Sequence, residues 1–398
     1  MAGRTAQSQI EPERASLSVD ALEALASGAS LRGELVARAA RLCIPLNAQI
    51  ETTARCNLRC VHCFVAEDHT RPAARELSLA RQLRLVDELA DAGCMFLTLT
   101  GGEVSLKKGW LRLVEAARRR RMSVTILTNG TLLTEQDAEA LARLKVRQVS
   151  ISIYGDTAEL HDGITGVPGS FARSVAAIRF LRVAGVRVRM ATVLMNQNVH
   201  CFDGVRRLAD NLGCEYRFEP TVRPMSDGDA APLRHRLPAD ALHRLYADPV
   251  IGPRTAEGKW KRLAAKGVAH EMNACAAGVS AVFVDAAGGV FACPGFMPGF
   301  GSVRRDDFAA VWGGEAAQDF RRSMREPVVE CMHCDDRQYC LTRCACLAAM
   351  EDGSLSGPST RACELARMTK QLCEDAAHAP HGASDLLPLD AGGLGRQE

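Results

Sequence analysis

The stretch TARCNLRCVHCF, residues 53–64, carries three cysteines close together. They are Cys56, Cys60 and Cys63, with three residues in the first gap and two in the second. The stretch follows an apolar run that predicts a β-strand, so the three thiols are expected on one loop at the end of that strand. A structural zinc site uses four ligands, and a cluster that only transfers electrons is usually held by four cysteines. Three thiolates leave one metal position open, which favours a 4Fe-4S cluster with one iron free to bind a small molecule.

The triplet by itself leaves two other interpretations open. One is a zinc site completed by His62 or His69, and the other is a set of unligated cysteines in a core. The spacing CxxxCxxC is short and also occurs by chance. Other features of the chain must therefore decide between the three interpretations.

The composition predicts a globular protein of two domains that binds metal. The chain has 398 residues, of which 47% are hydrophobic and 24% are charged, enough to bury a large core. Its formal net charge of +2 excludes a general basic field for nucleic acid or an anionic membrane. The N-terminal residues have no apolar signal core and no run of about 18 apolar residues follows, so we expect a cytoplasmic protein. In a reducing compartment, 16 cysteines favour metal binding over disulfides.

Strand-like apolar runs alternate with helical patterns through the first half of the chain. The expected strands are 47–53, 95–100, 123–128, 147–154, 186–195 and 214–220. The expected helices between them are 78–93, 111–119, 134–144, 170–185 and 200–213. This alternation predicts an α/β fold of right-handed βαβ units around a parallel sheet or partial barrel. In such folds the functional residues lie at the C-terminal ends of the strands.

Polar residues follow or end three of these strands. Gly101, Gly102 and Glu103 follow the second strand, where glycines allow a ligand near the backbone and the glutamate can pair with an ammonium group. Asn129 ends the third strand, and Ser152 lies in the fourth. Each alone is commonly a turn or helix-cap residue. Because all of them lie at the same rim of the sheet, together they predict a pocket beside the cysteine loop.

The combination of CxxxCxxC after the first strand, GGE after the second, TNG after the third and a serine in the fourth resembles the radical S-adenosylmethionine enzymes. The resemblance covers residues 47 to about 221 and implies a partial (βα)6 barrel. It implies that Cys56, Cys60 and Cys63 hold the cluster, that Gly101, Gly102 and Glu103 receive the methionine amino group, that Ser152 contacts the methionine or ribose, and that His62 lies near the adenine, with Asn129 in the same pocket. In this family, one electron from the reduced cluster breaks a carbon–sulfur bond of S-adenosylmethionine. The resulting 5′-deoxyadenosyl radical removes a hydrogen from an unactivated carbon, and a mostly closed barrel keeps it from water.

A second group of cysteines begins at residue 275. It comprises Cys275, Cys293, Cys331, Cys334, Cys340, Cys344 and Cys363, with Gly288 between the first two. The spacing resembles that of the SPASM domain. A zinc knuckle on the four cysteines from 331 to 344 would leave the other three without a role, so the seven thiolates favour two auxiliary 4Fe-4S clusters.

The SPASM resemblance also divides these thiolates between the two clusters. It implies an outer cluster held by Cys331, Cys334, Cys340 and Cys363, and an inner cluster held by Cys275, Cys293 and Cys344. The fourth ligand of the inner cluster stays open: it can be Cys346, another side chain, or a substrate. The remaining cysteines fit no pattern and are expected to be small buried hydrophobes: Cys43, Cys94, Cys201, Cys214 and Cys373.

SPASM proteins mostly modify peptides, so the resemblance implies a ribosomally made peptide that is crosslinked or oxidised. Sulfatase-maturing relatives carry an aspartate after the second SPASM cysteine, whereas Pro294 stands there in this chain, which disfavours formylglycine formation. The residues before the first strand are too few for a winged-helix module that grips a leader peptide, so a separate leader-binding protein or direct recognition is implied. The alternatives are oxidation of a small molecule, as in a haem pathway, and a non-catalytic iron–sulfur scaffold, in which GGE and an open cluster would serve nothing.

The predicted organisation has five parts and few partners. The parts are an N-terminal helical or flexible segment (1–46), the partial barrel (47–221), a connecting segment with perhaps two helices (222–270), the SPASM domain (271–373) and a disordered tail (374–398). The expected partners are the peptide and a reducing electron donor. Neither nucleic acid nor a membrane is expected.

Overall fold

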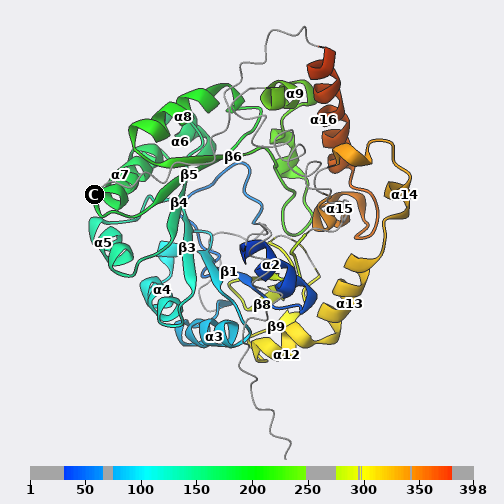
Figure 1. Ribbon diagram of the computed structural model, residues 1–398. Coiled ribbons are helices and arrows are strands. Elements are labelled where there is room, and N and C mark those ends of the chain that lie inside the picture. The colour runs from blue at the N-terminus through cyan, green and yellow to red at the C-terminus, as the bar shows by residue number, and fades with distance from the viewer. Residues whose placement is uncertain are drawn as a thin grey trace, which may run out of the picture.

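A partial barrel of parallel strands forms the first half of the protein. The computed structural model describes residues 31–65, 75–247, 275–294, 296, 298–340 and 343–378. Within these ranges the barrel strands are β1 (Asn47–Glu51), β2 (Phe96–Thr100), β3 (Ser123–Thr128), β4 (Gln148–Ser152), β5 (Val188–Val193) and β6 (Glu215–Glu219). Each strand pairs in parallel with the next one along the chain. The predicted partial (βα)6 barrel is therefore confirmed (Figure 1).

Helices cover the outer face of these strands (Figure 1). They are α3 (Leu79–Asp91), α4 (Trp110–Arg119), α5 (Glu135–Arg143), α6 (Ala158–Thr165), α7 (Ser170–Val183) and α8 (Phe202–Asn211). The sequence predicted all of them except α6, which is eight residues long and contains Gly163, so its apolar periodicity is weak. Its start is fixed by Thr157, whose side chain accepts a hydrogen bond from the Leu160 amide.

Buried and half-buried side chains alternate along the strands, so each strand has a packed face and an opposite face that is less buried. In β2 the side chains of Leu97 and Leu99 are at most 1% exposed and belong to the core cluster that also contains Leu85 and Leu89 of α3. The intervening residues Phe96, Thr98 and Thr100 are half-buried on the opposite face. Burying each leucine contributes roughly 1.5–3 kcal/mol. The packed face thus fixes the barrel, and the other face is left for the site.

The sheet does not end with the barrel. Within the described residues it has nine strands in the order β6-β5-β4-β3-β2-β1-β7-β8-β9. The added strands are β7 (Ala281–Val284), parallel to β1, and the antiparallel β8 (Gly289–Phe291) and β9 (Gly301–Ser302). Gly288 makes the β7–β8 turn with φ +96°, and a Cβ there would lie 2.9 Å from a methyl of Leu77. The sequence did not predict this continuity, because the strands are only two to four residues long.

The C-terminal helices continue the ring of helices begun by α3–α8 (Figure 1). They are α12 (Phe308–Gly313), α13 (Glu315–Arg325), α14 (Val329–Met332), the 3-10 turn η5 (Arg337–Tyr339), α15 (Ala345–Asp352) and α16 (Thr360–His378). Residues 374–378, assigned to a disordered tail, are the last residues of α16. Its six alanine and leucine residues favour helix beyond the last cysteine of the pattern.

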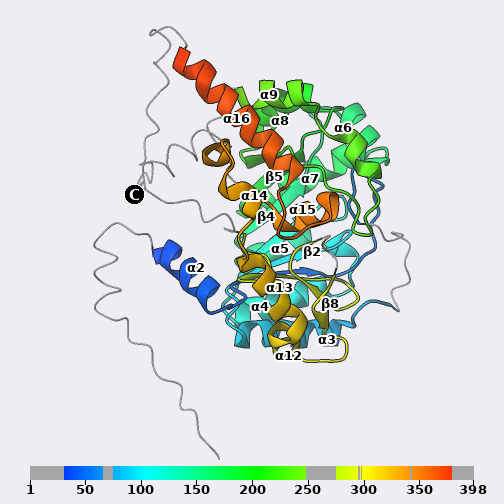
Figure 2. The same ribbon diagram turned by 90° about the vertical axis from the view of Figure 1, so that its right-hand side faces the viewer.

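Shorter elements join and flank these parts. They are α2 (Leu31–Arg41), the 3-10 turns η2 (Val104–Leu106), η3 (Val199–Cys201) and η4 (Ala231–His235), and α9 (Ala239–Ala247). Helix α2 lies beside the barrel (Figure 2). Of the connecting segment, η4 and α9 are described, whereas 248–270 lies outside the described residues, as does 1–30. No helix among the described residues is both long and apolar enough to cross a membrane.

Candidate functional site

The three cysteines of the opening stretch lie on the loop that follows β1. Their side chains are half-buried, and the Leu58 amide donates a hydrogen bond to the Cys56 sulfur at 3.4 Å. Burial raises the pKa of each thiol, and the charges of Cys63 and Cys56 raise the pKa of Cys60 further. Thiols that resist ionisation this strongly become thiolates when a cation compensates their charge. The loop therefore fits a cationic iron–sulfur core.

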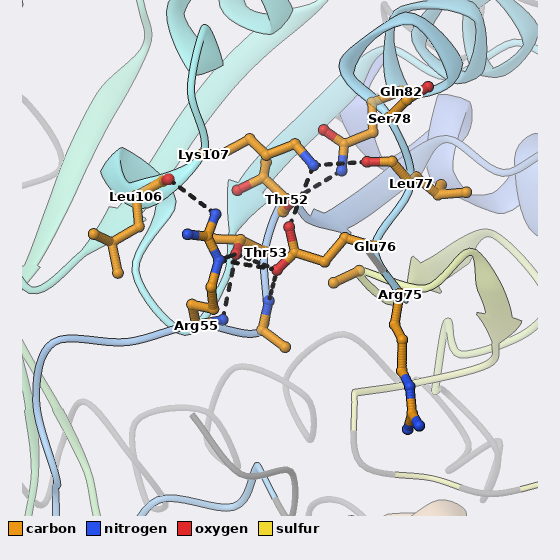
Figure 3. A network of polar contacts seen from close by, with 12 residues as sticks. Thr52, Thr53, Arg55, Arg75, Glu76, Leu77, Ser78, Gln82, Leu106 and Lys107 are labelled. Atoms are coloured by element: carbon orange, nitrogen blue, oxygen red, sulfur yellow. Dashed lines mark hydrogen bonds and ion pairs between the residues drawn. The ribbon is translucent and has the colours of Figure 1, made fainter. Parts of the chain in front are cut away.

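A buried carboxylate braces the start of this loop (Figure 3). Glu76 is 6% exposed and accepts hydrogen bonds from the Thr53 hydroxyl at 2.5 Å and the Ala54 amide at 3.2 Å. Its other oxygen lies 3.4 Å from the Lys107 ammonium, which also donates to the Leu77 carbonyl at 2.6 Å. The carboxylate and ammonium together hold the chain where it leaves β1.

Two further side chains complete this brace (Figure 3). Arg55, one residue before the first cysteine, donates to the Leu106 carbonyl at 3.1 Å. Gln82 of α3 donates to the Thr52 carbonyl at 2.8 Å. The sequence reasoning missed these partners, because no motif marks them and they come from segments far apart in the chain.

Gly101 and Gly102 pack against the same loop. The Gly102 amide donates to the Thr53 carbonyl at 2.7 Å. A Cβ at Gly101 would lie 2.7 Å from that carbonyl, and a Cβ at Gly102 would lie 2.5 Å from the Ala54 carbonyl. We expected these glycines to admit a ligand to the backbone, whereas here the chain's own backbone occupies the space beside them. Glycine is thus required for packing, whatever the two residues contact in a bound cofactor.

Glu103 joins the ends of β2 and β3. It is 1% exposed. One carboxylate oxygen accepts from the Ser105 amide at 3.1 Å, the Ser105 hydroxyl at 2.7 Å and the Thr128 hydroxyl at 2.7 Å. The other accepts from the Asn129 amide at 2.7 Å. This second oxygen keeps a lone pair for an ammonium group, so the predicted contact with a methionine amino group stays a proposal.

We expect Glu103→Gln to destabilise the protein by about 1–3 kcal/mol. The side-chain nitrogen of glutamine would face N–H or O–H groups from which the carboxylate now accepts hydrogen bonds. Urea unfolding of the reconstituted protein measures the change. Glu139→Gln is the matched control, since that side chain is 60% exposed and its pair with Arg143 is 3.7 Å long. Equal stability of the two variants would contradict the tie between β2 and β3.

Asn129 links β3 to the cysteine loop. Its side-chain nitrogen Nδ2 donates to the Asn57 side-chain oxygen Oδ1 at 3.0 Å and lies 3.9 Å from the Cys56 sulfur. The Asn129 side-chain oxygen Oδ1 accepts from the Thr131 backbone amide at 2.8 Å, and the Asn57 side chain donates to the Thr131 hydroxyl at 2.7 Å. The structure thus brings Asn129 beside Cys56, as the sequence predicted. Asn57 and Thr131 were missed, although both stand within the motifs that were read.

Ser152 and His62 meet at Tyr154, which the sequence reasoning also missed. Tyr154 is 8% exposed, and its ring lies edge-on to His62 with centroids 4.6 Å apart and stacks on His161 at 5.8 Å. The Ser152 side chain lies near the Tyr154 hydroxyl and acts to lower its pKa. Burial, and then the charge of Cys60, raise the pKa of Tyr154, so its hydroxyl is a proton donor beside the cysteine loop. Tyr154 stands two residues after Ser152 and therefore on the same face of the chain, and this spacing could have predicted its place in the site.

His62 is neutral at this place. Burial lowers its pKa to about 4, and its buried Nδ1 has no hydrogen-bond partner among the described residues. An uncharged imidazole beside an aromatic ring suits a flat, apolar ligand edge better than an anion. The predicted place of His62 near an adenine is compatible with this environment and remains a proposal.

The cysteines of the C-terminal half gather in two groups. In the outer group, the charge of Cys363 raises the pKa of both Cys331 and Cys340 after the larger effect of burial, and Cys334 contributes to both. The inner group contains Cys275, Cys293 and Cys344, whose charges act on one another, and Cys346 joins it. Arg343 is 9% exposed and lies near thiols of both groups. This grouping is compatible with the division that the SPASM resemblance implies, and the assignment of the thiols to two clusters stays a prediction.

Single metal ions fit these groups poorly. Among the residues that the structure describes, no three histidine, cysteine, aspartate or glutamate side chains converge on one ion position. A zinc site requires such convergence, whereas a cluster of several irons binds thiolates that stand further apart. His69 lies outside the described residues. The described geometry therefore favours clusters over the zinc alternatives.

Two family models match the chain. The Radical SAM superfamily matches residues 50–209, and an iron–sulfur cluster-binding domain, SPASM, matches residues 275–335. The first range contains the cysteine triplet and the residues around it. The second contains the first four cysteines of the second group, and the later ones lie beyond it.

Two of the whole proteins with related sequences have names of different kinds. The mycofactocin maturase MftC of Mycobacterium tuberculosis is 31% identical over 317 residues, which are 77% of this chain and 79% of that protein. The AdoMet-dependent heme synthase of Methanosarcina barkeri is 29% identical over 313 residues, which are 73% of this chain and 88% of that protein. Among solved structures, Streptococcus suis SuiB bound to precursor peptide SuiA has a TM-score of 0.64 at 17% identity, over 90% of this chain and 84% of that one. This last similarity concerns the fold alone.

Proposed function

Because the chain belongs to the radical S-adenosylmethionine enzymes with a C-terminal SPASM domain, and uses 4Fe-4S clusters and S-adenosylmethionine as they do, we propose that it is a peptide maturase. It removes a hydrogen atom from a ribosomally made peptide, which is then crosslinked or oxidised. The observation that carries the proposal is the 31% identity to a maturase over 77% of this chain, which is too long to reflect the barrel alone.

The residues at the barrel rim have definite roles under this proposal. When bound, the reduced cluster and S-adenosylmethionine supply the 5′-deoxyadenosyl radical. Cys56, Cys60 and Cys63 hold the cluster, and the second oxygen of Glu103 orients the methionine ammonium. Tyr154 and His62 form a buried aromatic wall that excludes water.

The C-terminal half would hold the other two clusters. The outer four cysteines and the inner group supply separate sets of thiolates, and Arg343 offsets part of their negative charge from between them. The peptide reaches this enzyme either directly or through a separate leader-binding protein, and a reducing protein supplies the electron.

A second candidate is the oxidation of a small molecule of the haem pathway. The 29% identity to heme synthases, which covers 88% of the Methanosarcina barkeri protein, favours it. The two candidates share the barrel, the cofactors and the second group of cysteines. They differ in the size and polarity of the substrate.

Deuterium transfer separates the candidates. The anaerobically reconstituted enzyme is incubated with S-adenosylmethionine, dithionite and either deuterated peptides encoded beside its gene or a deuterated haem precursor. We expect deuterium in 5′-deoxyadenosine and a changed mass of the peptide. Transfer from the haem precursor, with none from any peptide, would replace the proposal with the second candidate.

A further inference from the structure

The inner group of cysteines contains a fourth thiol. Cys346 lies in the first turn of α15, a helix whose N-cap residue is Cys344. The Cys346 side chain is 2% exposed and belongs to the core cluster against which Cys275, Cys293 and Cys344 pack. The charges of these three thiols also act on the Cys346 thiol. Four thiols from three separate segments therefore lie in the same part of the core, where the sequence pattern supplied only three.

A half-buried cation, Arg223, points at the same group. Arg223 follows β6, and its guanidinium donates a hydrogen bond to the Cys293 sulfur at 3.6 Å. The charges of Cys293, Cys344 and Glu219 all act favourably on this guanidinium. A hydrogen bond between a charged donor and sulfur crosses here from the barrel side to the C-terminal half.

A guanidinium partly enclosed by protein is stabilised by opposite charges, and Glu219 supplies part of that charge here. A 4Fe-4S cluster with four thiolates carries a net negative charge, and its sulfurs accept hydrogen bonds that raise its reduction potential. A four-thiolate cluster is thus a partner that suits both the fourth thiol and the Arg223 guanidinium.

We propose that Cys346 is the fourth protein ligand of the inner auxiliary cluster, and that Arg223 donates a hydrogen bond to this cluster and raises its potential. The cluster then has no iron open to a substrate thiolate, so the substrate does not bind there. The proposal rests on the cofactors of the family and not on the identity of the substrate. Its tests contain no substrate, so their failure and the failure of the peptide proposal are distinguishable.

The first test removes the fourth thiol from the full chain. In anaerobically reconstituted Cys346→Ala, we expect iron analysis to show a loss of up to about four irons per chain, and the electron paramagnetic resonance of one auxiliary cluster to change. Cys201→Ala is the matched control, because Cys201 is 5% exposed and donates a hydrogen bond to the Asn198 carbonyl. Wild-type iron content and an unchanged spectrum in Cys346→Ala would overturn the ligand assignment.

Cys346→Ser is the control that separates loss of a cluster ligand from a folding defect. Serine can remain near the cluster as an oxygen ligand, so this variant should keep its fold while the spectrum of one auxiliary cluster shifts. A serine variant with the wild-type spectrum would also overturn the assignment.

The second test concerns the arginine. In a redox titration followed by electron paramagnetic resonance, Arg223→Gln should lower the midpoint potential of one auxiliary cluster without changing the iron content. Arg223→Lys, which keeps the charge and a donor, should shift the potential less. Unchanged potentials of all clusters in Arg223→Gln would overturn this part of the proposal.

Discussion

Replacing Cys56, Cys60 and Cys63 together with alanine is expected to abolish the cleavage of S-adenosylmethionine to 5′-deoxyadenosine and methionine. These thiols are the protein ligands proposed for the cluster that binds the cofactor, and their loop lies apart from both C-terminal groups of cysteines. Iron analysis should show a loss of about four irons per chain, and the auxiliary clusters should remain. Chromatography of the nucleoside product and iron and sulfide analysis measure the two effects.

The control is Cys94→Ala, which removes a buried thiol of the barrel core. Cys94 is 5% exposed and donates to the Phe96 carbonyl at 3.5 Å, so its loss should change neither iron content nor cleavage. Loss of all iron from the triple variant would show that the C-terminal clusters depend on the barrel loop. Retained cleavage would remove the loop from the site.

Local patterns predicted the barrel because each element obeys its own periodicity. The alternation of β2 and the apolar stripe of α3, which begins at the predicted cap Ser78, each depend on neighbouring residues only. Strand β7 depends instead on pairing with β1, which lies more than 200 residues away in the chain, and β8 pairs onto β7 and β9 onto β8 in turn. Runs of two to four residues carry too little periodicity to reveal such a partner.

The motifs predicted which rim residues gather, and missed how they are held. Asn129 was expected in the pocket, yet its tie to Asn57 and Thr131 depends on side-chain rotamers that no spacing encodes. Glu103 was expected to bind a ligand, and most of its acceptor capacity serves the chain itself. A motif therefore identifies a place more reliably than it divides that place between structure and ligand.

Glu76 belongs to no motif, yet we expect its replacement to have a large effect on the stability of the fold and on the cysteine loop. We expect Glu76→Gln to lower the free energy of unfolding by about 3–5 kcal/mol, because it leaves the buried ammonium of Lys107 without its carboxylate. The Lys107 side chain is 10% exposed, so water cannot replace the lost partner easily. Glutamine keeps a single acceptor oxygen, which can serve either the Lys107 ammonium or the Thr53 hydroxyl and Ala54 amide, so the cysteine loop should also retain iron less well.

Glu115→Gln separates the brace from a general effect of charge. Its pair with Arg119 spans 3.2 Å with side chains 51% and 67% exposed, and such pairs contribute about 0–1 kcal/mol. Urea unfolding and iron retention on desalting are measured for both variants and for the wild type. If Glu76→Gln behaved like the control, the carboxylate would be a bystander of the loop. If it lost stability but kept all its iron, the brace would support the fold without positioning the cysteines. The two measurements together therefore decide whether Glu76 stabilises the fold, positions the cysteines, or does both.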